Sequence, residues 1–417
     1  MFAMFQPFTV KTVAARGCYG EVPRAWRLAV FIYSLHVGPA SFVKWLSSDL
    51  LDATTRVAPA IRTLADTGEE ERSLPQGIVD ALSDEGFFTL LLPPDVGGKG
   101  HSPSASLAAM SAIAFADGAT GWCSMISSTT CLLAGFLESE TAKTTFGAAT
   151  AVGGVFAPNG KGRRTEDGVV VSGRWQWGSG LGHCDWVVAG VVLDDGDRVT
   201  VVVPQSEVEI VDTWQTVGMR GTGSVDFTIN DAFVPTERII SQIGAKPTTD
   251  DPIAHFPNFS ILGAGVAAVA LGIAERAWSE TVTLVNERSP QFSSRLLSQQ
   301  ASVQSAIARS RTRLDAAANE LLSSVEAAYQ VVLEGKKASV DERVRIRGAA
   351  ALVAEESSAT AQEMFRLAGG AAVYDTSILG RCLRNLSVIP QHIMVAPRLF
   401  ETLGRHYLGL EFESSMI

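Results

Sequence analysis

Hydrophobic and polar positions change character three times along the chain. Between residues 50 and 150, apolar and small residues dominate, and the runs 105–115 and 121–137 predict buried helices. Ser73 and Gln76 have the spacing of a capping box, with Pro75 in the first turn, and they predict that a helix begins there. Gly86 predicts the end of that helix, because glycine is the preferred residue just past a helix C-terminus.

From about residue 151 the pattern becomes that of strands. Valine-rich runs at 169–171, 186–192, 199–203 and 225–229 predict four of them. The Asp-Asp-Gly-Asp sequence at 194–197 predicts a hairpin turn between the second and the third. These runs indicate a compact β-domain inserted between two helical regions.

Past Pro257 the helical pattern returns. Ile307, Leu314, Leu321 and Ala328 recur every seven residues beside a second row formed by Ala318, Val325 and Val332. Two adjacent rows make one long apolar stripe, and we expect a long helix that ends at Gly335. Ser339 and Glu342 predict a capping box for a next helix reaching Gly369 and Gly370, and a final helix is expected over 385–403.

Long amphipathic helices with short links favour an antiparallel bundle. The predicted division is an extension of unknown role at 1–45, a helical domain at 46–150, a β-domain at 151–245 and a four-helix bundle at 246–417.

Composition narrows the range of functions. The 417 residues are 46% hydrophobic and 19% charged, with a net charge of −10, which disfavours binding to nucleic acid or to an anionic membrane. The five cysteines are widely spaced and form no CxxC pair, which favours a reducing, cytoplasmic setting. No uninterrupted apolar run reaches the roughly 18 residues of a membrane helix, so no span is expected. The stretch 28–37 resembles a signal peptide, but Ser34 and His36 interrupt it.

Two motifs imitate known sites without their context. Gly263, Gly265 and Ala268 resemble a dinucleotide fingerprint, yet they fall in a helical region without a preceding strand, so we interpret them as helix-packing residues. His183 and Cys184 have no partners at metal-ligand spacing, and no metal site is expected.

Two further stretches resemble the acyl-CoA dehydrogenase superfamily. The first is Val-Gly-Met-Arg-Gly-Thr-Gly-Ser at 217–224, continued by Phe-Val-Pro at 233–235, and the second is Ser-Gly-Arg-Trp-Gln-Trp-Gly-Ser-Gly at 172–180. The resemblance covers about residues 50–410. It implies a mainly α fold with a central β-domain, comprising an N-terminal helical domain, a β-barrel-like middle domain and a C-terminal four-helix bundle, and it implies a homotetramer.

The second stretch is similar to the family's flavin strand, in which an aromatic residue covers the isoalloxazine and a hydroxyl reaches flavin N5. The resemblance gives these roles to Trp177 and Ser179. From the residues themselves, Trp175 and Trp177 at i and i+2 predict an aromatic wall on one strand face, and Gly180 allows a flat ring to approach the backbone. The alternative interpretation is a pair of core tryptophans.

The chain departs from the dehydrogenases at the catalytic base. Aligning Arg384 with the family arginine places His392 and Ile393 where the dehydrogenases carry tyrosine and glutamate. A second position used by a minority of the family falls at Leu262, beside Gly263. The first acid after Arg384 is Glu401, so neither customary base is present.

Gln391 and His392 are instead similar to the flavin-dependent monooxygenase branch of the superfamily. In that branch a separate reductase supplies reduced FMN or FAD, and the oxygenase uses O₂ to hydroxylate an aromatic compound. The resemblance makes His392 the residue that supports the oxygenated flavin and the substrate, for which a histidine titrating near neutral pH is suited. It lets Ser179 retard the loss of hydrogen peroxide, and it places Trp122 in the substrate pocket.

Other implied flavin contacts are less regular. Arg366 stands where the dehydrogenases have a glutamine, before Gly369 and Gly370, and alanines replace the following Asn-Gly, which leaves FMN as open as FAD. Arg288 would meet a flavin phosphate across a subunit interface, or else form a surface ion pair with Glu287 or Glu280.

We therefore predict a two-component flavin-dependent monooxygenase acting on a small aromatic or polycyclic substrate. His392 and Trp122 have structural alternatives as core residues. An acyl-CoA dehydrogenase with a relocated base, for which Glu401 is the nearest acid, is the alternative function, and a non-catalytic binding member of the fold is a third.

Overall fold

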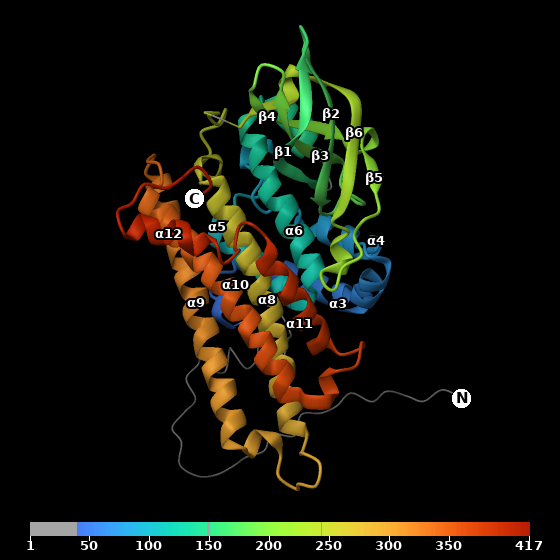
Figure 1. The fold of residues 1–417 in the computed structure, drawn as a ribbon, viewed down its shortest axis with the longest axis vertical. Helices are drawn as coiled ribbons and strands as arrows, with labels where there is room; N and C mark the ends of the chain where they lie inside the picture. Colours follow the sequence, from blue (N-terminus) through green and yellow to red (C-terminus); the bar gives the residue numbers. More distant parts are fainter. Residues whose placement is uncertain (1–39, 148–150, 243) are drawn as a thin grey trace, which may run out of the picture.

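The computed structural model describes residues 40–147, 151–242 and 244–417, arranged as a helical body with a β-domain at one end (Figure 1). Helices from both ends of the chain form the body, and the β-domain lies between them in sequence. The signal-like stretch 28–37 and most of the predicted extension lie outside the described residues.

The N-terminal helices are α2 (Ala40–Val43), α3 (Ser48–Glu71), α4 (Gln76–Glu85), α5 (Pro103–Ala116), α6 (Gly118–Thr130) and α7 (Ser139–Ala142). Gly86 ends α4 in a left-handed conformation with a φ of 79°, as predicted. The predicted Ser73 capping box is wrong: Pro75 is the N-cap, and Gln76 Nε2 donates instead to Asp80 Oδ1 at 2.7 Å. Asp117 caps α6 by accepting from the Thr120 backbone N–H.

A single seven-stranded sheet forms the β-domain, in the order β5-β6-β2-β1-β3-β4-β7. Its strands are β1 (Val152–Arg164), β2 (Gly168–Gly178), β3 (Trp186–Leu193), β4 (Arg198–Pro204), β5 (Glu209–Val211), β6 (Val225–Pro235) and β7 (Ile239–Ser241). The β1–β3 pair is parallel, and the other pairs are antiparallel. The predicted hairpin joins β3 to β4, with Gly196 at a φ of 91°.

The C-terminal region contains α8 (Asn258–Glu287), α9 (Ala301–Leu333), α10 (Val340–Ala368), α11 (Ile378–Val388) and α12 (Leu399–Tyr407). The heptad stripe is confirmed, because Leu314, Leu321 and Ala328 are fully buried on α9. The capping box of α10 is also confirmed: the Glu342 N–H donates to Ser339 Oγ at 3.2 Å, and the Ser339 N–H donates to Glu342 Oε2 at 2.6 Å.

The predicted helix over 385–403 is wrong. α11 ends at Val388, a 3₁₀ turn follows at Ile389–Gln391, and α12 begins only at Leu399. Pro390 and Pro397 lack the N–H that a continuous helix would need. The break between the two helices carries His392.

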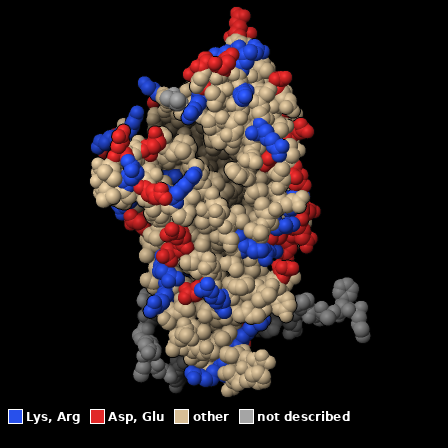
Figure 2. All heavy atoms as spheres, viewed as in Figure 1, with Lys and Arg blue, Asp and Glu red and all other residues tan. Residues whose placement is uncertain are grey.

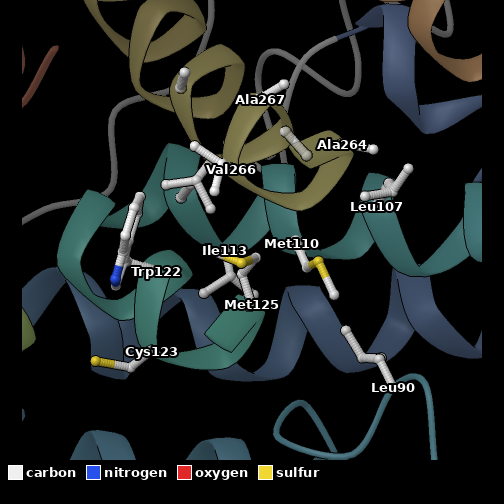
Figure 3. Packing of buried hydrophobic residues seen from close by; sticks show 14 of the residues in the cluster. Leu90, Leu107, Met110, Ile113, Trp122, Cys123, Met125, Ala264, Val266 and Ala267 are labelled. Atoms are coloured by element: carbon white, nitrogen blue, oxygen red, sulfur yellow. The ribbon is translucent and has the colours of Figure 1, made fainter. Parts of the chain in front are cut away.

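α8 runs through the middle of the helical body. Contrary to the expectation from the sequence, its 30 residues are long and apolar enough to cross a membrane, but 83% of its most apolar window is buried inside the described structure. Small residues let it pack closely: a Cβ at Gly265 would lie 2.8 Å from Met125 Cγ. Figure 3 shows Val266 of α8 facing Ile113 of α5 and Met125 of α6. The glycines near 263 therefore serve helix packing, as predicted.

Charged side chains of both signs are interspersed over the face of the molecule shown in Figure 2, with uncharged surface between them. On this side of the described structure no extended patch of a single sign is seen.

Candidate functional site

The two tryptophans of β2 have opposite environments. Trp175 is fully buried, its Nε1 donates to the Gly190 carbonyl at 2.8 Å, and its ring stacks on Phe227 with centroids 5.1 Å apart. Trp177 is 67% exposed and has a φ of 67°. The register between β2 and β6 shifts between Trp175 and Gly178, and this irregularity turns Trp177 away from the face of Trp175. The predicted shared aromatic wall is therefore wrong, and Trp175 packs in the core.

Ser179 follows β2 directly and joins a buried chain of hydroxyl groups. Trp122 Nε1, on α6, donates to Ser179 Oγ at 3.0 Å. Ser179 Oγ lies 2.7 Å from Ser224 Oγ, which lies 2.7 Å from Thr222 Oγ1. Thr222 Oγ1 donates to the Met219 carbonyl at 2.8 Å. The chain thus crosses from the helical domain, through the end of β2, to the loop that precedes β6.

His392 also contacts Trp122. Their ring centroids are 5.5 Å apart at an angle of 78°, an edge-to-face contact. The backbone at His392 is extended, with a φ of −70° and a ψ of 130°, and the Met394 N–H donates to His392 Nδ1 at 3.3 Å. Because Nδ1 accepts this bond, the proton of the neutral ring is assigned to Nε2. Three predicted residues, Trp122, Ser179 and His392, therefore form one cluster.

His392 is half-buried, and its partial removal from solvent lowers its pKa to about 4, while the charge of Arg347 acts in the same direction. Arg347 is 1% exposed, and its Nη1 contacts the Phe259 carbonyl at 2.8 Å and Met394 Sδ at 3.0 Å. Burial in turn lowers the pKa of Arg347 to about 10, which leaves it charged at neutral pH. His392 is accordingly a neutral hydrogen-bond donor at pH 7, and the expected titration near neutrality is wrong for this environment.

Among the described residues, no carboxylate shifts the pKa of His392. The one charged group that does so is Arg347, which lowers it. Ile393 and Leu262, which the sequence comparison aligned with the base positions of the dehydrogenases, carry apolar side chains. Glu401 is exposed in the first turn of α12. The cluster can donate and accept hydrogen bonds, but it lacks the ionised acid that proton removal from a thioester requires.

Of the other predicted flavin contacts, Gly180 lies next to this cluster. It has a φ of 74°, its N–H donates to the Thr222 carbonyl at 3.1 Å, and a Cβ there would lie 3.1 Å from His183 Nε2. Arg288 is exposed at the end of α8, and Glu280 pairs with Arg276 rather than with it.

Arg366, Gly369 and Gly370 lie where α10 ends, at the end of the bundle away from the β-domain (Figure 1). Within one subunit the structure does not bring Arg288 or these three residues to Ser179. Among the described residues, no group of three or more histidine, cysteine or acidic side chains could hold a metal ion.

Three residues next to the cluster, Ser224, Thr222 and Arg347, were not predicted from the sequence. Ser224 and Thr222 lie inside the quoted glycine-arginine loop, but loop spacing carries no information on which hydroxyls meet. Arg347 lies in a helix rich in charged residues, where an exposed position was the natural expectation. Gly263 is the one sequence feature that relates to this burial: a Cβ there would lie 2.5 Å from Arg347 Nη1, so the glycine leaves space for the guanidinium.

The sequence matches two domains of a known protein family. The domains described as "Acyl-CoA dehydrogenase, N-terminal domain" and "Acyl-CoA dehydrogenase, C-terminal domain" match residues 52–144 and 264–397. The chain belongs to the acyl-CoA dehydrogenase family.

Its relatives point to one branch of that family. It is 29% identical over 386 residues to the flavin-dependent monooxygenase, oxygenase subunit HsaA, of Mycobacterium tuberculosis, covering 89% of this chain and 98% of that protein. It is 28% identical over 358 residues to the indole-3-acetate monooxygenase of Pseudomonas putida, covering 84% and 91%.

Among solved structures, the 3-HSA hydroxylase of Rhodococcus sp. RHA1 superposes with a TM-score of 0.82 at 27% identity, covering 89% of this chain and all (100%) of that one. The fold and the branch expected from the motifs are confirmed.

Proposed function

We propose that this protein is the oxygenase component of a two-component flavin-dependent monooxygenase, which hydroxylates a small aromatic or polycyclic substrate with reduced flavin and O₂. The observation that carries the proposal is the cluster of Trp122, Ser179 and neutral His392, with no carboxylate acting on the histidine among the described residues. The relatives named as monooxygenases support the same function.

The residues at the end of β2 suit a flavin ring. Trp177 exposes 67% of its surface and is two residues from the buried hydroxyl of Ser179, and an exposed aromatic face is a favourable surface for a planar ring. Ser179 has a lone pair left for a polar atom of that ring. When bound, the reduced flavin would supply the activation of O₂.

The contacts of each residue in the cluster define its role in the proposed reaction. His392 presents Nε2–H as a donor to the oxygen or hydroxyl group that reacts. Trp122 holds Ser179 through its Nε1–H and contacts the histidine ring edge-to-face, so it couples the positions of the two polar groups. Low local polarity strengthens each of these bonds.

The flavin form and the assembly belong to the proposal as well. Arg288 and Arg366 are available to a flavin phosphate contributed across a subunit interface, which either FMN or FAD would provide. The exposed Val217, Val373 and Tyr374, each 68–71% accessible, are consistent with burial in a homotetramer. A separate reductase would deliver the reduced flavin.

The test is to mix the protein with anaerobically reduced FMN, and separately FAD, and then with oxygenated buffer in a stopped-flow spectrometer. We expect an absorbing species that forms before oxidised flavin appears and lives longer than in free flavin. His392→Ala should shorten its lifetime, while Ser377→Ala, a change at the start of α11, should not. Tight binding of oxidised FAD that an acyl-CoA thioester bleaches would refute the proposal and establish a dehydrogenase.

A further inference from the structure

The hydroxyl chain at the end of β2 has one arrangement of protons. Its first member, Trp122 Nε1, is only a donor, and its last member, the Met219 carbonyl, is only an acceptor. Thr222 has one hydroxyl proton and gives it to Met219 O at 2.8 Å. The 2.7 Å contact between Thr222 and Ser224 must then use the proton of Ser224.

The direction of the hydrogen bonds at Ser179 follows from the proton of Ser224. Since the proton of Ser224 is committed to Thr222, the 2.7 Å contact between Ser179 and Ser224 uses the proton of Ser179. Reversing the chain would place the lone pairs of Thr222 Oγ1 and Met219 O against each other at 2.8 Å. Ser179 therefore accepts from Trp122, donates to Ser224, and keeps only a lone pair for a ligand.

Burial makes this arrangement hard to change. The exposed fractions are 5% for Ser179, 4% for Ser224, 2% for Thr222 and 8% for Trp122. No water from bulk solvent can readily take the place of a chain member at such burial, and hydrogen bonds in series polarise one another in the same sense. The acceptor character of Ser179 is thus set by Ser224 and Thr222, two other buried residues of the chain.

We propose that Thr222 and Ser224 are positioning residues that hold Ser179 as a hydrogen-bond acceptor and thereby make the site prefer reduced over oxidised flavin. The inference rests on the proposed function and on the contact between Ser179 and flavin N5 that the resemblance implies. Reduced flavin carries a hydrogen on N5 that Ser179 could accept, whereas N5 of oxidised flavin has only a lone pair, which would meet the lone pair of Ser179. Such a site captures the reduced flavin and releases the oxidised one.

The test measures binding without turnover. Dissociation constants of the full-length protein for oxidised FMN and FAD, and for the same flavins reduced under anaerobic conditions, give a ratio of oxidised to reduced. In Thr222→Val, Ser224 loses its acceptor and can donate to Ser179, which frees the Ser179 proton for N5. We expect this ratio to fall about three- to tenfold, the range of one neutral hydrogen bond.

Ser224→Ala removes the acceptor of Ser179 directly and should lower the ratio in the same direction, so it serves if Thr222→Val does not fold. Thr222→Ser retains the hydroxyl and should keep the wild-type ratio. A ratio unchanged in both disrupting variants, or a wild-type protein that binds both flavins equally, would overturn the inference. A wild-type protein that binds neither form would instead contradict the proposed function.

Discussion

The substitution Gly263→Ala tests whether Arg347 stabilises the loop that carries His392 and Met394. The guanidinium of Arg347 occupies the space beside Gly263, and a Cβ there would lie 2.5 Å from Arg347 Nη1. An ordinary contact needs about 3.4 Å, so Nη1 must move by roughly 1 Å. That movement breaks or lengthens its bonds to the Phe259 carbonyl and to Met394 Sδ, now 2.8 and 3.0 Å.

The magnitude follows from the bonds that are lost. A hydrogen bond from a charged donor contributes about 1.5–3 kcal/mol, and at 1% exposure Arg347 has little access to water that could replace a lost partner. Replacing glycine by alanine inside a helix stabilises by about 0.5–1 kcal/mol. Gly348→Ala, inside α10, is the matched control. It should show only this helix stabilisation, because a Cβ there would lie 3.4 Å from Leu403 Cδ1, an ordinary contact distance. We expect Gly263→Ala to be about 1.5–3 kcal/mol less stable than Gly348→Ala.

Urea unfolding of the two variants beside wild type measures the difference from the midpoints. Gly348→Ala should be at least as stable as wild type, and Gly263→Ala less stable. Combining Gly263→Ala with Arg347→Met should cost less than the sum of the single changes, because both act on the same contacts. Equal stability of the two alanine variants would refute the argued role of Arg347.

Three further predictions address the histidines and the helix caps. His392→Ala should lower the fraction of consumed O₂ that yields hydroxylated product by about tenfold, the value of one strong hydrogen bond, and equal coupling would exclude its role. Burial lowers the pKa of both His183 and His392 to about 4 from about 6.5, so the unfolded chain takes up protons first as the pH falls. The free energy of unfolding should therefore decrease between about pH 6.5 and pH 4, and His392→Gln should make that decrease shallower in urea titrations at each pH; an unchanged slope would contradict it. Ser339→Ala removes a capping bond and should destabilise by about 1 kcal/mol, whereas Ser377→Ala, at an N-cap without a side-chain bond, should change the urea midpoint little.

Periodic features of the fold could be predicted from the sequence. The stripe of α9, the capping box of α10 and the hairpin at Gly196 each depend on residues close together in the chain. The long strand β1 could not be predicted, because its sequence contains Gly153, Gly154, Gly160 and Gly162 in place of an alternating pattern.

The glycines of β1 make sense only with its neighbours in place. A Cβ at Gly160 would lie 2.2 Å from Trp175, so the glycine admits that ring. The same ring explains the error over the two tryptophans: alternation along β2 predicts one shared face, and a local shift in register against β6 overrides it.

The candidate site could be predicted from the sequence only in part. Ser179 and His392 could be named through motifs, but their chemical states depend on groups distant in sequence. Ser179 accepts because of Thr222 and Ser224, and His392 is neutral because of burial near Arg347. Hydrogen-bond direction and burial are properties of the packed structure, and no spacing along the chain encodes them.

The most direct test of the central claim is the fate of the oxygen atoms. The protein would be incubated under ¹⁸O₂ with a flavin reductase, NADH as the electron donor, flavin, and phenol-type or indole-type substrates, and the products analysed by mass spectrometry. The account predicts a product that carries one ¹⁸O atom, with its yield reduced in His392→Ala. A product without ¹⁸O, or one formed anaerobically from an acyl-CoA thioester, would contradict the account.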